Sequence, residues 1–113
     1  MARGKCYEQA FCYLINWATP GMVLCHGIAR QDKPPRLYFG HAWLETGKRV
    51  IDVATGTPQR AWHATYYREG QIDPALVVRY AAEDARRLAL HHRHYGPWDP
   101  LIAAAAHHRK RTG

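Results

Sequence analysis

The chain has 113 residues, a formal net charge of +7 at pH 7, and 47% apolar residues, with four Trp and seven Tyr among them. This length suits a single domain over residues 1–113, with enough apolar and aromatic side chains for a real core. No apolar run reaches the length of a membrane span, and the N-terminus lacks the apolar segment of a signal peptide, so we expect a cytoplasmic location and no contact with a membrane.

The three cysteines, Cys6, Cys12 and Cys25, are an odd number without a secretory signal, which argues against a disulfide framework. Their spacing also excludes a zinc finger, because no close pair of Cys is followed by a second pair of Cys or His. We therefore expect free thiols and no cofactor.

Residues 5–18 are predicted to form a helix that ends at Thr19-Pro20-Gly21. Cys6 then falls in the first turn, directly after Lys5. The free amides and the macrodipole of a helix N-terminus favour a thiolate, and those amides can also stabilise an oxyanion. The simpler alternative is that Cys6 is a small buried core residue, as most free cysteines are.

Residues 22–28 form a compact apolar run that predicts a strand, followed by a polar loop over 30–35. If the strand is regular, Cys25 and His26 point to opposite faces. His26 could line a site, but we expect it to face solvent. The next strand starts near Leu37 and leads directly into a hairpin.

Residues 40–53 are typical of a β-hairpin, because apolar and β-branched residues flank a short polar centre. With Thr46-Gly47 as the two-residue turn, His41 lies directly opposite Asp52. Directly opposed residues have Cβ atoms about 4.5–5.5 Å apart, so the carboxylate can accept a hydrogen bond from the imidazole and fix its tautomer. The alternative is a pair on a solvated strand face, and a longer turn would change the register.

The second half of the chain is predicted to contain fewer strands and more helix. Residues 58–67 are expected to form a short helix or an irregular cover, whose aromatics either wall a substrate cleft or plug the open end of the sheet. A fourth strand is expected over 75–80 and helices over 82–94 and 101–109, the last capped by Asp99-Pro100. The predicted fold is α+β: an N-terminal Cys-bearing helix packed on an antiparallel sheet of about four strands, with C-terminal helices.

Three segments in this order resemble the papain-like superfamily in its compact form, especially the transglutaminase-like branch and its small bacterial and phage members. They are Gly4–Ala10 on the helix, Gly40–Glu45 on one strand, and Val50-Ile51-Asp52 on the next. The resemblance covers residues 4–53, a little under half of the chain.

The resemblance implies a catalytic triad of Cys6 as nucleophile, His41 as general base and later acid, and Asp52 as the residue that orients the imidazole. The residues themselves suggest the same roles. The implied reaction is thiol-dependent hydrolysis or acyl transfer at an amide or isopeptide bond of a peptide or protein. Papain-type proteases add an upstream glutamine to the oxyanion hole; none precedes Cys6 here, so the Trp43 indole or another backbone amide would have to serve.

Two other functions use different residues or a different chemistry. A non-catalytic phage or mobile-element module could bind a host protein, another acidic partner or a nucleic acid through the basic C-terminal half, which includes Arg86, Arg87, Arg93 and the tail 107–111. A zinc site could instead use Cys6 and His41 with Asp52 or His26. We rank the zinc site below the triad, because a direct His–Asp pair occupies the ring nitrogen that a metal would need.

Overall fold

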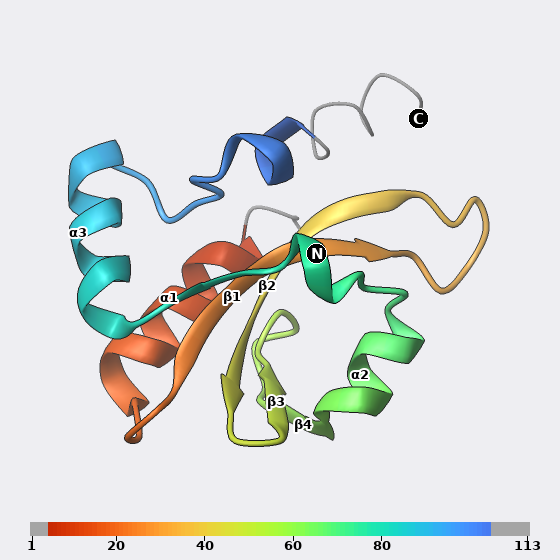
Figure 1. Cartoon of the computed structure of the whole chain (residues 1–113), viewed down its shortest axis with the longest axis horizontal. Helices are drawn as coiled ribbons and strands as arrows, with labels where there is room; N and C mark the ends of the chain where they lie inside the picture. Colours follow the sequence, from red (N-terminus) through yellow and green to blue (C-terminus); the bar gives the residue numbers. More distant parts are fainter. Residues whose placement is uncertain (1–4, 105–113) are drawn as a thin grey trace.

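The structure is a computed structural model that describes residues 5–104 (Figure 1). Its elements follow the order helix, four strands, helix, short 3-10 turn, strand and helix. They are α1 (Lys5–Trp17), β1 (Val23–Arg30), β2 (Tyr38–Thr46), β3 (Arg49–Asp52), β4 (Gln59–Trp62), α2 (His63–Glu69), η1 (Pro74–Leu76), β5 (Val78–Tyr80) and α3 (Ala82–His92).

The strands form one sheet in the order β4-β3-β2-β1-β5, and every neighbouring pair is antiparallel. The fold is therefore α+β, with an N-terminal helix and further helices around an antiparallel sheet, as the sequence predicts. The number of strands in the described part is five rather than about four. The additional strand is β4, which lies within 58–67, where a short helix or irregular cover was expected; only the second part of that segment, α2, is helical.

The sheet carries a core on each face, because alternate residues of a strand point in opposite directions. On one face, Ala10 and Leu14 of α1 pack with Leu24, Leu44 and other buried side chains of the sheet. α3 lies on the same side as α1, and Figure 1 shows α3 (cyan) and α2 (green) at opposite sides of the view.

The second core lies on the opposite face, where α2 and the segment after it cover the sheet. There Tyr67 and Ile72 pack against Cys25, Trp43 and Val50. This arrangement leaves α1 and α2 on opposite faces of the sheet.

The hairpin between β2 and β3 has a different register from the predicted one. Its turn is Gly47-Lys48, with Thr46 opposite Arg49, so Asp52 does not lie directly opposite His41. Gly47 has a φ of +60°, which a glycine adopts without steric cost. The first position of a tight two-residue hairpin turn requires a positive φ, so Gly47 suits that position. The register moves by two residues, and an even shift keeps every side chain on its predicted face.

The C-terminal part of the description ends in a helical segment at residues 100–104. The Asp99 carboxylate accepts a hydrogen bond from the Leu101 amide at 2.9 Å, so the predicted cap is confirmed. The remainder of the predicted helix, 105–109, lies outside the described residues. Within 5–104, none of the helices combines the length and the apolar character needed to cross a bilayer.

Candidate active site

Cys6 occupies the first turn of α1, as the sequence predicts, and its residue surface is 5% exposed. It belongs to the core between α1 and the sheet, so the interpretation of Cys6 as a buried core residue is also correct in part. All three cysteines are free. What distinguishes Cys6 from an ordinary core thiol is its neighbour, which is His41.

His41 and Asp52 form a direct side-chain pair, with 2.9 Å between His41 Nε2 and Asp52 Oδ2. The pairing is diagonal across the hairpin and not directly opposed, which the reach of both side chains allows. The other carboxylate oxygen, Asp52 Oδ1, accepts a hydrogen bond from the Ala54 amide at 2.8 Å. Both oxygens of Asp52 are thus engaged, and the carboxylate is fixed in orientation toward the imidazole.

The Cys6 thiol lies close enough to the His41 imidazole to raise the pKa of His41. Because Nε2 of His41 faces Asp52, Nδ1 is the ring nitrogen left for the sulfur. The two residues come from opposite sides of the sheet, since Ala42 belongs to the core under α1 and His41 must point the other way.

This contact depends on the length of β3. β2 pairs with β3 only at Leu44, Glu45 and Thr46. His41 therefore lies on a part of β2, before these paired residues, that β3 does not pair with, and Cys6 of the first turn of α1 lies near its imidazole. The structure therefore brings together all three residues of the predicted triad.

The pKa values of His41 and Asp52 shift in opposite directions, as expected for two groups that stabilise each other's charge. Burial lowers the pKa of His41, but the hydrogen bond to Asp52, the Asp52 charge and the nearby Cys6 thiol outweigh burial and raise this pKa to about 9. Burial also raises the pKa of Asp52, and the contacts with His41, Tyr66 and the Ala54 amide reverse this and lower it to about 2. Near neutral pH the imidazolium and the carboxylate are the favoured forms.

Tyr66 is a member of the cluster that sequence reasoning did not single out. Its hydroxyl donates to Asp52 Oδ2 at 2.6 Å and lies 3.1 Å from His41 Nε2. Burial and the Asp52 carboxylate raise the pKa of Tyr66, so it remains a hydrogen-bond donor. The aromatic content of 58–67 was the available signal, but it could not show that one tyrosine of α2 would contact the pair.

The Trp43 indole, considered above as an oxyanion donor, is engaged elsewhere. It donates to Glu45 Oε2 at 3.0 Å. The same buried carboxylate accepts from the Tyr67 hydroxyl and, at 3.0 Å, from Arg79 Nε. Trp43 therefore has a structural role, and its ring stacks beside His41 with 5.9 Å between ring centroids.

A cavity of about 510 Å³ opens beside the cluster on the α2 face of the sheet. His41 and Tyr66 line it together with Phe39, and charged side chains stand at Arg30 and Glu69. Part of the predicted aromatic segment thus borders a hollow next to His41. The side chain of His41 is 12% exposed, so the imidazole is reachable from this side.

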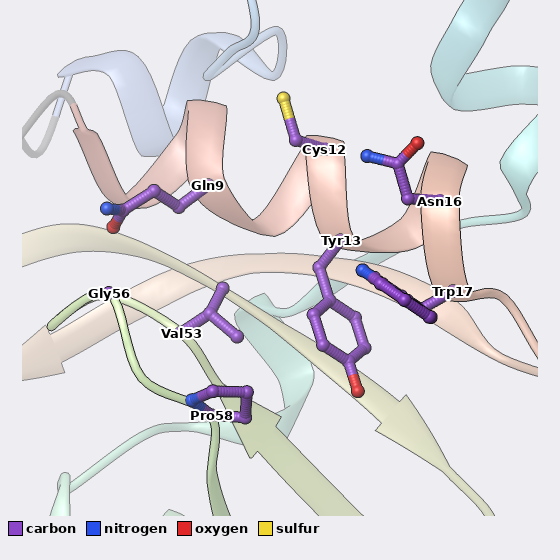
Figure 2. A pocket seen from close by; sticks show the side chains of 8 residues that line it. All are labelled: Gln9, Cys12, Tyr13, Asn16, Trp17, Val53, Gly56 and Pro58. Carbon is purple, nitrogen blue, oxygen red and sulfur yellow. The ribbon is translucent and has the colours of Figure 1, made fainter.

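Cys12 lines a second hollow, whose lining does not include Cys6. This second hollow, also about 510 Å³, lies between the outer face of α1 and the loop after β3, and Tyr13 and Trp17 line it with Cys12 (Figure 2). At its edge Gln9 donates to the carbonyls of Val53 and Ala54, both at 3.0 Å, when its amide nitrogen faces them. Figure 2 shows Gln9 reaching from α1 toward this loop. One helix therefore supplies Cys6 and also anchors the segment that holds Asp52.

The prediction that His26 faces solvent is wrong. His26 is 0% exposed, and its ring packs against Tyr7, Tyr80 and Trp98. Alternate residues of β1 point to opposite faces of the sheet. His26 therefore lies on the α1 face, and its neighbour Cys25 lies on the α2 face. His26 therefore does not join His41 in a metal site. Among residues 5–104, no group of three or more Cys, His, Asp or Glu side chains is placed to hold a metal ion.

Comparison of the chain with known protein families, with curated proteins and with solved structures finds no match.

Proposed function

We propose that the protein is a thiol-dependent hydrolase or acyltransferase with a Cys6-His41-Asp52 triad. The observation that carries the proposal is the continuous chain of side-chain contacts from the Cys6 thiol through His41 to Asp52, with 2.9 Å in the last step. A thiol beside an imidazole that a carboxylate orients is the arrangement that nucleophilic acyl chemistry needs.

In this proposal the proton of Cys6 resides on His41, so that a thiolate and an imidazolium stand side by side, and the thiolate attacks the acyl carbon of the substrate. The imidazolium then protonates the leaving amine, and a thioester remains on Cys6. Water or a second amine attacks the thioester, with His41 accepting its proton, and the free thiol is restored. Hydrolysis and acyl transfer differ only in this last nucleophile.

Two features of the fold support the assignment of roles. Cys6 lies in the first turn of the 13-residue helix α1, where unbonded backbone amides can stabilise the oxyanion of the tetrahedral intermediate. The raised pKa of His41, about 9, favours the imidazolium that must protonate the leaving group. An amide or isopeptide bond of a peptide or protein is the substrate class that suits a strong thiolate nucleophile and a general acid.

The compact papain-like or transglutaminase-like core is part of the same proposal. It is supported by the order of a Cys-bearing helix, a strand with His-Ala-Trp and a following strand with Asp, on an α+β fold with an antiparallel sheet.

An acyl-enzyme experiment tests this function. The protein is mixed with p-nitrophenyl acetate at pH 7.5, nitrophenol release is followed by absorbance, and the acylated residue is identified by peptide mass spectrometry. We expect a rapid burst and an acetyl group on Cys6 in the wild type. In Cys6→Ala the burst should be lost, and Cys12→Ala, a matched control, should keep it. Equal acetylation of Cys6 in the wild type and in His41→Ala would refute the proposed role of His41.

A further inference from the structure

A third hollow lies between α1 and α3, and its lining is largely apolar. Its volume is about 480 Å³, within the range of small-molecule sites. Phe11 and Ile15 of α1 form one wall, and Leu90 and Tyr95 line the other side. Leu90 is 80% exposed, so that a large apolar side chain faces water on the otherwise charged helix α3.

The polar part of this lining has one sign of charge. Arg86 and Arg93 both border the hollow, and no acidic side chain does. Within residues 5–104 neither guanidinium makes an ion pair or a side-chain hydrogen bond, whereas the neighbouring Arg87 is paired with Asp84 at 3.3 Å. The two arginines are therefore free to bind an incoming anion.

His94 adds an oriented donor at the same rim. Its Nδ1 accepts a hydrogen bond from the Gly96 amide at 3.0 Å, so the proton of the neutral ring sits on Nε2. The helix period places Arg86 and Leu90, at i and i+4, on one face of α3. Arg93 directly follows the helix as its left-handed C-cap residue, with a φ of +62°, and borders the same hollow.

From this arrangement we propose that the groove between α1 and α3 binds a small amphiphilic anion, with an apolar body on the groove wall and a carboxylate-like head on Arg86 and Arg93. Residues 1–4 and 105–113, which lie outside the described range, contain no acidic side chain that could pair with the two arginines. A cationic or uncharged ligand would leave both guanidinium groups without a partner. The proposal is independent of the function proposed for Cys6.

The test uses two probes with the same alkyl chain and opposite charge, decanoate and decyltrimethylammonium, each below its micelle concentration. Calorimetry gives the affinity, and amide chemical shifts of the labelled protein locate the site. We expect decanoate to bind, with the largest shifts in α3 and in the second half of α1, from Phe11 onward. Decyltrimethylammonium should bind at least about tenfold more weakly, since its head would face two cations.

Adjacent arginines provide a matched pair of variants. Arg86→Gln should weaken decanoate binding about threefold or more, whereas Arg87→Gln, which removes the same charge outside the groove, should change it by less than about 1.5-fold. Leu90→Gln should weaken it about fivefold, and Leu101→Gln, at another exposed leucine, should not. All four positions are exposed, so folding should be preserved.

Three outcomes would overturn the proposal. They are the absence of measurable decanoate binding, equal binding of the cationic probe, and an equal loss of affinity in the Arg86 and Arg87 variants. Shifts centred on either of the two other hollows would overturn it as well.

Discussion

Replacing His26 by leucine should remove a large part of the acid sensitivity of the fold. His26 is fully buried among aromatic rings, and neither ring nitrogen has a hydrogen-bond partner in the described part of the chain. Burial therefore lowers the pKa of His26 to about 3, from an ordinary value of 6.5. Its surroundings are Tyr7, Tyr80 and Trp98, which carry no charge at neutral pH.

The sign of the effect follows from proton binding. Below pH 6.5 the unfolded chain takes up a proton on His26, but the folded chain does not do so until about pH 3. Acid therefore stabilises the unfolded state, and the free energy of unfolding falls as the pH decreases through this window. At pH 5 the difference between the two states amounts to about 2 kcal/mol, at about 1.4 kcal/mol per pKa unit.

The assay is urea unfolding of the wild type and of His26→Leu at pH 7 and pH 5. Between these two pH values the wild type should lose about 2 kcal/mol more than the variant, since leucine has no proton to gain. Titration of the other histidines affects both proteins equally and cancels in the comparison. The same loss in both proteins would refute the account of His26 as a neutral buried group.

Three further substitutions test other parts of the structure. Tyr66→Phe removes one donor from the Asp52 carboxylate and should lower the free energy of unfolding by about 2 kcal/mol at pH 7, measured by urea titration; an unchanged midpoint would contradict the hydrogen bond. Glu45→Gln puts an amide among several donors and leaves a partly exposed arginine without its charge partner, so we expect a loss of about 2–3 kcal/mol by the same method. Gly27→Ala places a Cβ 2.6 Å from Cη2 of Trp43 and should cost about 1–3 kcal/mol, visible as a lower Tm; an unchanged Tm would show that the indole can move aside.

The candidate site was predictable from the sequence because its three residues depend on local periodicity. Helical spacing placed Cys6 in a first turn, and strand alternation placed His41 and Asp52 on one face of a hairpin. The predicted turn was wrong by one position, but an error of two in the register leaves the face unchanged. The pair therefore forms, although diagonally.

The parts that could not be predicted depend on contacts between distant segments. β4 consists of four residues that are mostly exposed, and it is a strand because it pairs with the edge of β3. Tyr66 reaches Asp52 because α2, which follows β4 in the chain, packs back onto the face of the sheet that carries Asp52. His26 has a polar side chain in an apolar strand, and nothing local shows that Trp98, 72 positions later, will cover it.

The most direct test of the Cys6-His41 couple is the pH dependence of iodoacetamide alkylation, read at each cysteine by mass spectrometry in the wild type and in His41→Ala. Cys12 and Cys25 are internal references, because burial raises the pKa of both thiols. The account predicts that Cys6 reacts near neutral pH in the wild type, well ahead of both references, and that this advantage disappears in the variant. A Cys6 that reacts no faster than Cys12 and Cys25, with no effect of His41→Ala, would contradict it.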